Sequence, residues 1–366
     1  MKAYEIINLM DKWAKPYYID KWDNTGFQIG DGNKEIKKII LSLNIDDVLL
    51  EKAQSAGADM IITHHPIIFK PINNIISSDY KGRLIMNIIK SDIVVYNAHS
   101  NLDICKNGVN DRLAGILNLK NSKVLSSLYQ EKFYKLVVFV PEGCEEKIRD
   151  VLGKAGAGWI GNYSNCTYNI DGMGTFLPLE NTHPFIGQKN VLEKVKEKRI
   201  ETIVREREAD RIIEEMIKAH PYEEVAYDLY PLENKGADYG YGRVGDIEEI
   251  SMKALIEEIK RKLTVKNIRV YGGENKKINR IAVCGGSGGD FIYDAYRKNA
   301  QVYITGDIKY HEAQLAKELG LILIDSNHYD TEKIILPVIK EYILEHTNEK
   351  IEVDISDINS YGFQEY

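Results

Sequence analysis

Residues 37–65 read KKIILSLNIDDVLLEKAQSAGADMIITHH, and this stretch decides the fold. The apolar run KKIILSLNI is typical of a buried strand, a helical pattern follows from Asp46 to Ser55, and a second apolar run, ADMIITHH, indicates another strand. Two such strands joined by a helix predict a βαβ unit with parallel strands covered by helices. The stretch therefore predicts an α/β protein, and we expect residues 22–32, upstream of it, to form a polar loop.

The same alternation continues along the chain. A helical pattern covers Tyr80–Lys90, the strand-like run SDIVVYNAHS follows, and another helical pattern covers Gly108–Leu117. Beyond residue 275 the strand-like runs INRIAVCGG, AQVYITGD and GLILIDSNH alternate with helical patterns over Phe291–Lys298 and Glu312–Leu319. Each run of the second set matches one of the first set, which indicates an internal duplication. The alternative is the general likeness of all α/β sequences, and the pattern leaves both open.

The middle of the chain, from Lys132 to Glu233, has a different order of predicted strands and helices. A strand-like YKLVVFVP precedes a helical pattern over Cys144–Ala155, and a Gly-, Asn- and Tyr-rich stretch typical of a hairpin leads to a further strand–helix–strand pattern. This order fits a ferredoxin-like α+β unit, which can be inserted where its ends lie close. We therefore predict an α/β protein in which two similar βαβ-type halves, 1–128 and 236–366, form a metal-binding body around an inserted ferredoxin-like α+β domain, 129–235.

Composition bounds the class of protein. The 366 residues suffice for two or three domains of roughly 100 to 200 residues each. With 44% hydrophobic and 28% charged residues the chain is a typical globular protein, and the formal charge of −7 argues against general binding to nucleic acid or anionic membranes. No run of about 18 apolar residues predicts a membrane span, and we expect no signal peptide. Cys105, Cys144, Cys166 and Cys284 form no C-x-x-C pair, so a reducing cytoplasm fits best.

Four of the eight histidines, His64, His65, His99 and His328, lie at the carboxyl ends of predicted parallel strands. This edge of an α/β sheet is where ligands bind. Asp103 is the last residue of NAHSNLD, in the turn after the strand. Glu332 follows His328 at a spacing of i, i+4, so the side chains of His328 and Glu332 share one helix face. Imidazole and carboxylate ligands suit Zn, Mn or Fe, and two ions would use this set better than one. The alternative is a set of surface or core histidines without a metal.

Six motifs in order along the chain resemble one known family: WDNTGFQIG, ITHHPIIFK, NAHSNLD, GGSGGD, ITGDIKYHEA and DSNHYDTE. The sequence is similar over nearly its whole length to the Nif-three-like family, the GTP cyclohydrolase 1 type 2 homologues. The resemblance implies two divalent metal ions per chain, held by His64, His65, Asp103, His328 and Glu332, with Glu332 bridging both. It also implies a PII-like or CutA-like insertion and assembly as a toroidal homohexamer.

Other segments are weaker candidates for substrate binding or catalysis. The GGSGGD turn, with Gly286, Ser287 and Gly288, could cradle a phosphate through free N–H groups or be only a tight turn. It fails as a dinucleotide fingerprint, although Asp307 lies at the distance of a ribose-binding acid. Three further candidates are possible substrate contacts or buried anchors: Trp22, Asp23 and Asn24. Three more are possible acid–base groups or partners of the metal ligands: His99, His311 and Glu312.

These observations favour a cytoplasmic metal-dependent hydrolase with a small-molecule substrate. By resemblance the activity is that of a GTP cyclohydrolase, in which metal-activated water opens the guanine ring of GTP, so the expected partner is a nucleotide. Two alternatives stay open. One is a metal or metabolite sensor, or metallochaperone, without turnover, and the other is a metal-dependent phosphoesterase that acts on nucleotides or nucleic acid.

Overall fold

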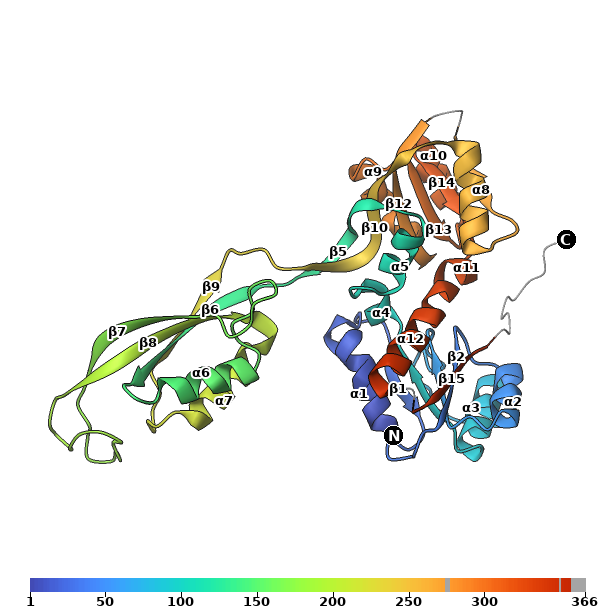
Figure 1. Ribbon diagram of the computed structural model, residues 1–366. Helices are drawn as coiled ribbons and strands as arrows, with labels where there is room; N and C mark the ends of the chain where they lie inside the picture. Colours follow the sequence, from blue (N-terminus) through green and yellow to red (C-terminus); the bar gives the residue numbers. More distant parts are fainter. Residues whose placement is uncertain (274–276, 349, 357–366) are drawn as a thin grey trace. The chain divides into compact units, whose positions relative to one another are not determined.

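The structure is a computed structural model that describes residues 1–273, 277–348 and 350–356 (Figure 1). Contacts divide the chain into two compact units. One unit, which we call the body, combines Met1–Leu128 with the chain beyond Asp238, and the other, which we call the insert, is Tyr129–Asp238. Among the described residues, no helix is both long and apolar enough to cross a membrane.

The first sheet of the body has five strands in the order β1-β4-β3-β2-β15. Their bounds are β1 Gly26–Ile29, β2 Lys38–Ser42, β3 Met60–Thr63, β4 Val94–Asn97 and β15 Glu352–Ile355. Strands β15, β2, β3 and β4 are parallel, whereas β1 pairs antiparallel with β4. The βαβ unit predicted from residues 37–65 is confirmed, because the helix between β2 and β3 connects two parallel neighbours.

Helices α2 (Asp47–Ser55) and α3 (Tyr80–Lys90) cover one face of this sheet through apolar side chains. Leu50 and Ile85, for example, belong to one buried cluster with Ile61 of β3. Both helices begin at an aspartate whose side chain accepts a backbone N–H, Asp46 from Leu49 and Asp79 from Gly82. These caps explain why the helices start where the sequence pattern predicts. The remaining helices beside this sheet are α1 Ala3–Trp13, η1 Pro16–Tyr18, α4 Ser100–Ile104 and α12 Leu336–Thr347.

The expected polar loop at residues 22–32 is wrong in part, because it contains β1. The register pairs Gly26 with Asn97 and Phe27 with Tyr96. Of the four residues in β1 only Ile29 is buried, so the strand has no apolar run that a sequence pattern could reveal. Its pairing is supplied by the free edge of β4, a tertiary contact.

The second sheet of the body has six strands in the order β11-β14-β13-β12-β10-β5. Their bounds are β5 Lys120–Gln130, β10 Asp238–Ser251, β11 Arg269–Tyr271, β12 Lys277–Ser287, β13 Val302–Gly306 and β14 Ile322–Asp325. Strands β12, β13 and β14, which the sequence predicted, are parallel, and β10 and β11 pair antiparallel with their neighbours.

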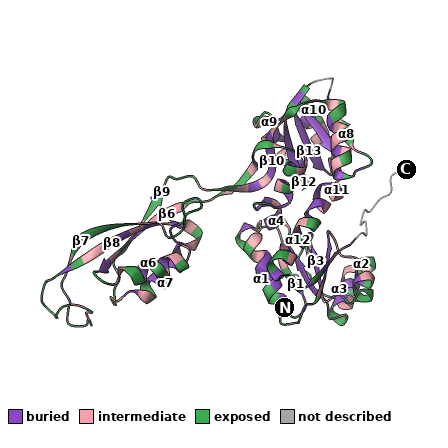
Figure 2. Ribbon diagram, in the orientation of Figure 1, coloured by how far each residue is buried: buried purple, intermediate pink, exposed green. Residues whose placement is uncertain are grey.

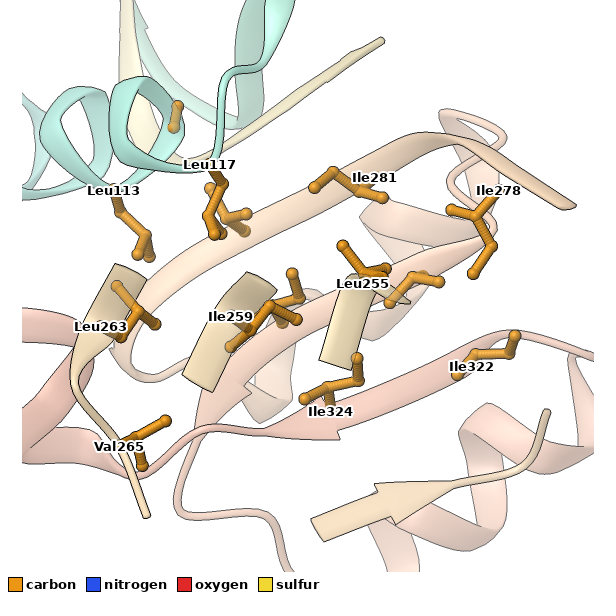
Figure 3. Packing of buried hydrophobic residues seen from close by; sticks show 14 of the residues in the cluster. Leu113, Leu117, Leu255, Ile259, Leu263, Val265, Ile278, Ile281, Ile322 and Ile324 are labelled. Atoms are coloured by element: carbon orange, nitrogen blue, oxygen red, sulfur yellow. The ribbon is translucent and has the colours of Figure 1, made fainter. Parts of the chain in front are cut away.

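Both faces of the second sheet are covered by helices. On one face α5 (Val109–Ile116) and α8 (Met252–Leu263) bury Leu113 and Ile259 against Ile281 and Ile324 (Figure 3). On the other face α9 (Ile292–Arg297) and α10 (Tyr310–Glu318) pack with Tyr303 and Leu323. The short helices η3 Gly289–Phe291, α11 His328–Glu332 and η4 Lys333–Ile335 complete this part. The central parallel strands β2, β3, β4, β13 and β14 are buried almost throughout, whereas the edge strands β1, β5 and β11 are largely not (Figure 2).

Each sheet of the body includes a strand from the opposite half of the sequence. Strand β15, near the C-terminus, extends the first sheet beside β2, while β5 and α5, from the N-terminal segment, join the second sheet and its core. Each sheet is therefore completed by a segment from the other half of the sequence. The duplication expected from the repeated pattern stays a prediction.

The insert has the predicted βαββαβ order of a ferredoxin-like unit. Its elements are β6 Phe133–Pro141, α6 Glu145–Lys154, β7 Thr167–Phe176, β8 Glu193–Arg205, η2 Glu206–Glu208, α7 Ala209–Ala219 and β9 Tyr227–Leu232. The sheet order is β7-β8-β6-β9 and every pairing is antiparallel. Ile148 of α6 and Ile212 of α7 pack on Ile200 of β8 in the insert's own core.

Candidate metal centre

The carboxyl ends of three parallel strands bring together the residues that the sequence singled out. His64 and His65 directly follow β3, Asp103 lies on the short helix α4 after β4, and His328 and Glu332 form the two ends of α11 after β14. Strands β3 and β4 are parallel neighbours in the first sheet, so the residues after them share one edge, whereas α11 follows β14 of the second sheet. The body therefore collects, from positions up to 268 apart in sequence, side chains that suit a metal ion.

One group of potential ligands consists of His65, His328 and Glu332. The Nε2 atoms of the two histidines lie 3.0 and 3.1 Å from Oε2 of Glu332. The same two nitrogens are 3.2 Å apart. Three donor atoms thus converge on one point.

A second group consists of His64, Asp103 and Glu332. Nε2 of His64 lies 3.5 Å from Oδ1 of Asp103 and 3.7 Å from Oε1 of Glu332. Glu332 therefore presents Oε2 to the first group and Oε1 to the second. This arrangement is what a carboxylate bridging two cations requires.

Three buried polar atoms of these groups have no hydrogen-bond partner: His64 Nε2, Asp103 Oδ1 and Glu332 Oε2. Leaving a buried polar atom unsatisfied costs about 1–3 kcal/mol, so such atoms need an explanation in a native protein. All three are metal-ligand types and belong to the same cluster. The residues present therefore fit divalent cations with nitrogen and oxygen ligands.

The other ring nitrogen of each histidine in these groups is already engaged. Nδ1 of His64 donates to the Ala98 carbonyl at 2.7 Å, and Nδ1 of His65 donates to Asn44 Oδ1 at 2.8 Å. Nδ1 of His328 donates to Asp307 Oδ2 at 2.7 Å. With the proton on Nδ1, each Nε2 carries the lone pair that binds a metal, and such partners orient metal-binding histidines.

Sequence reasoning did not identify Asn44 or Asp307 as hydrogen-bond partners of the candidate ligands. Both follow a strand of the body by one or two residues, and this position was the signal that could have identified them. Asp307 has a φ of 56°, a left-handed conformation that aspartate tolerates better than most residues. Asp307 adopts this backbone conformation in the turn after β13, where its carboxylate lies within hydrogen-bond distance of His328.

The buried carboxylates of the cluster need nearby positive charge to stay ionised. Burial would raise the pKa of Glu332, but His65, His64 and His328 hold it well below the ordinary value. Burial would lower the pKa of His328, but Glu332 and Asp307 raise it to about 10. The pKa of His64 is likewise raised, because Asp103 and Glu332 outweigh burial, whereas burial lowers the pKa of His65. Protons or metal cations can provide this charge, and they compete for the same nitrogens.

His99 and Asp23 form a pair beside the cluster. His99 Nδ1 donates to Asp23 Oδ1 at 2.9 Å, and Asp23 also accepts the Ser100 hydroxyl at 2.6 Å. Although burial would raise the pKa of Asp23, these hydrogen bonds hold it far below the ordinary value. The His99 ring centroid lies 5.2 and 5.3 Å from those of His64 and His65. The pair therefore holds an imidazole next to the candidate ligands.

A cavity of about 730 Å³ opens onto the cluster. His65, His99, Asp103, His328 and Glu332 line it, together with aromatic and small residues. Trp22, one of the predicted substrate contacts, is 53% exposed and lies at this lining. The other two candidates for substrate contact, Asp23 and Asn24, make contacts within the protein. The Asp23 side chain is buried, and the Asn24 amide donates to the Ile68 carbonyl.

At the GGSGGD turn, three of the N–H groups that a phosphate cradle would use have acceptors within the protein. The Gly285, Gly286 and Gly288 N–H groups donate at 3.0 Å to Asn110 Oδ1, Thr331 Oγ1 and Thr305 Oγ1, respectively. Because side chains of the protein already accept these hydrogen bonds, the N–H groups are not available to a phosphate. The sequence alone does not reveal these acceptors. Ser287 lines the cavity.

A third group of potential ligands consists of His64, His65 and His99, and the remaining predicted site residues lie apart from all three groups. Glu312 caps the start of α10 by accepting the Lys309 N–H at 2.8 Å, and His311 is exposed beside Tyr310. Neither residue is among those that line the cavity in the described chain. The groups of potential metal ligands found among the described residues all lie in the body.

Comparisons with known proteins agree with the fold and the motifs. The family model for Duf34/NIF3 (NGG1p interacting factor 3) matches residues 1–361. A Halalkalibacterium halodurans protein named GTP cyclohydrolase 1 type 2 homolog is 43% identical over 337 residues, 92% of this chain and 90% of that protein. A Bacillus subtilis protein of the same name is 40% identical over 99% of both chains. The crystal structure of a Bacillus cereus protein related to NIF3 matches 100% of this chain and 99% of that one, with a TM-score of 0.89 and 39% identity. The chain therefore belongs to the Duf34/NIF3 family.

Proposed function

We propose that this protein is a hydrolase that depends on two divalent cations and acts on a guanine nucleotide or a related compound. The observation that carries the proposal is the position of Glu332, whose two oxygens face two different groups of candidate ligands. In this proposal His65 and His328 would hold one cation, His64 and Asp103 would hold the other, and Glu332 would offer one oxygen to each. Zn, Mn and Fe all suit these ligands.

Divalent cations at this position would supply Lewis-acid activation of water near neutral pH. The protein's own contribution is orientation. The Ala98 carbonyl, Asn44 and Asp307 fix the three imidazoles with Nε2 toward the centre. Because these partners are held by the fold, the ligand atoms need no reorganisation when a cation binds.

His99 is the residue that we propose to move a proton. Its Nδ1 is held by the buried Asp23 carboxylate, and its ring lies at the cavity lining, so Nε2 can take or give a proton at a substrate there. A histidine oriented by a carboxylate is a common general acid–base pair. Ser100 is no nucleophile in this proposal, because its hydroxyl donates to Asp23.

The substrate class rests on two supports. The relatives carry the name GTP cyclohydrolase 1 type 2 homolog, and the cavity has aromatic residues suited to a planar ring. We infer from these that the guanine ring is the group opened by hydrolysis. The alternative of a sensor or metallochaperone shares the metal centre but predicts binding without product.

The test is to load the purified protein with Mn, Zn or Fe, determine its metal content by elemental analysis, and incubate it with GTP while formate is measured. We expect release of formate, and we expect His99→Gln to bind the metals normally but lose most of the activity. A generic phosphodiester serves as the second substrate. Saturable GTP binding with two bound metals and no product from either substrate would contradict the hydrolase proposal and favour a sensor.

A further inference from the structure

We propose that the body cavity recognises the planar ring of its ligand and gives the phosphates no binding site, so that an uncharged purine nucleoside binds at least as tightly as the triphosphate. The inference rests on the proposed function only in taking this cavity as the substrate site. It concerns binding and not turnover, so the two can be tested separately.

The charge of the cavity lining carries the inference. Four carboxylates line it, those of Asp20, Asp103, Asp290 and Glu332, whereas no Lys or Arg is among the described residues of the lining. Proteins that bind phosphates use Arg or Lys side chains, because these provide charge-assisted hydrogen bonds. The N–H groups of Gly285, Gly286 and Gly288, a possible substitute, donate to internal side chains.

Bound cations do not give the lining a net positive charge. Two divalent cations would no more than neutralise the four carboxylates of the lining, and Asp23 and Asp307 add further negative charge next to His99 and His328. Without cations, these six carboxylates outnumber the four histidines beside them even with every imidazole protonated. In neither state is there a net positive charge for a triphosphate, whose burial without compensation is costly.

Aromatic side chains provide the attraction for a ring. Trp22 and Phe69 form one pair with ring centroids 5.8 Å apart, and Tyr241 and Phe291 form a second, stacked pair with centroids 5.2 Å apart. All four residues line the cavity. Nucleobases stack on such side chains, and this interaction needs no charge on the ligand.

Three lysines are direct sequence neighbours of lining residues: Lys21, Lys70 and Lys333. Lys333 pairs with Asp330, whereas Lys21, beside Trp22, and Lys70, beside Phe69, are exposed and outside the lining. They are the residues that could hold phosphates at the mouth of the cavity if the inference were wrong. The double variant Lys21→Ala/Lys70→Ala therefore belongs in the test.

The experiment is isothermal titration of the metal-loaded full chain with guanosine and with GTP, at low salt and at about 0.5 M NaCl. We expect guanosine to bind at least as tightly as GTP at low salt, and GTP affinity to rise or stay constant with salt, because screening weakens repulsion. Trp22→Ala should lower the affinity for both guanosine and GTP by about ten-fold or more. Trp159→Ala, which removes an exposed tryptophan of the insert, is the control and should leave both unchanged.

A charge reversal sharpens the test. Asp290 is exposed, so Asp290→Lys should fold, and it places a cation in the lining. We expect this variant to gain GTP affinity several-fold and to leave guanosine affinity unchanged. GTP binding ten-fold tighter than guanosine in the unaltered protein, or selective loss of GTP affinity in the Lys21→Ala/Lys70→Ala variant, would overturn the inference. Preferential guanosine binding without formate release would instead refute only the hydrolase proposal.

Discussion

Glu332 faces both groups of candidate ligands with separate oxygens. We predict that Glu332→Gln lowers the occupancy of both metal sites, because an amide oxygen lacks the negative charge and cannot bridge as a carboxylate does. Elemental analysis of the purified variant measures this directly. Glu345→Gln, on the exposed side of α12, is the matched control and should keep full metal content. Loss of a single equivalent in Glu332→Gln would contradict bridging.

Asp307 is the hydrogen-bond partner of His328 and does not itself belong to the groups of potential ligands in the described chain. We predict that Asp307→Ala weakens metal binding at the His65–His328 side by about 10- to 100-fold, because the imidazole loses its orientation. Metal titration with a chromophoric chelator gives the affinity. Asp31→Ala, at a loop aspartate outside the cluster, should change nothing, and equal affinities in both variants would show that Asp307 has no positioning role.

At the scale of an element, β12 makes room for the Glu332 carboxylate at Gly286. This glycine has a φ of 65°, and a Cβ there would lie 2.2 Å from Glu332 Oε1. Gly57 has the same φ with no atom within 4 Å of its Cβ position. We predict that Gly57→Ala costs about 1 kcal/mol of unfolding free energy from the backbone alone, and that Gly286→Ala costs more and also lowers metal content. Urea denaturation and elemental analysis of both variants separate the two effects, and equal losses without a change in metal content would contradict the contact.

Helix α2 depends on its aspartate cap. The Asp46 side chain accepts the Leu49 N–H at 2.8 Å, and this interaction ends with substitution by alanine. We predict that Asp46→Ala lowers the free energy of unfolding by about 1 kcal/mol. The control is Glu51→Ala, at an exposed position of the same helix, which should change it by less than about 0.5 kcal/mol. Urea denaturation of both variants decides the question.

At the scale of the whole molecule, the body should fold and bind metal without the insert. Strands β5 and β10 are neighbours in the second sheet, and a Cβ on Gly240 would lie 2.0 Å from the Ser126 carbonyl oxygen. The two chain segments that lead to the insert are therefore adjacent within the body. We predict that joining Leu128 to Tyr239 through a short Gly/Ser linker leaves a folded protein with unchanged metal stoichiometry, because the cost of loop closure rises slowly with length.

Elemental analysis and thermal denaturation of this deletion variant, beside the full chain, provide the measurement. The insert has its own core around Ile148, Ile200 and Ile212, and the core clusters of the body in the described chain contain no residue of the insert. A folded deletion variant that binds no metal would show that the insert contributes to the centre. The mass of both proteins in solution tests, in addition, whether the insert supports the expected hexamer.

The sequence by itself determined the local elements and the candidate ligands. Residues 37–65 form the predicted βαβ unit, because apolar runs and helical spacing are properties of a short segment that can be recognised without knowledge of its tertiary contacts. The same holds for the βαββαβ order of the insert. His64, His65, Asp103, His328 and Glu332 could be named because each follows a recognisable strand, and strand ends are where α/β proteins bind ligands. That β14 of the second sheet ends beside β3 and β4 of the first was decided by the tertiary structure.

Only the tertiary structure decided how these parts combine. Strand β1 and the exchange of β5 and β15 between sheets depend on pairing with segments far away in sequence, and a short strand such as Gly26–Ile29 has no periodicity of its own. The orientation of His65 and His328 depends on Asn44 and Asp307 through contacts of 2.7 to 2.8 Å. The occupied N–H groups of Gly285, Gly286 and Gly288 were hidden for the same reason. Hydrogen bonds act over a few ångströms in space, and only the folded chain brings their partners within that range.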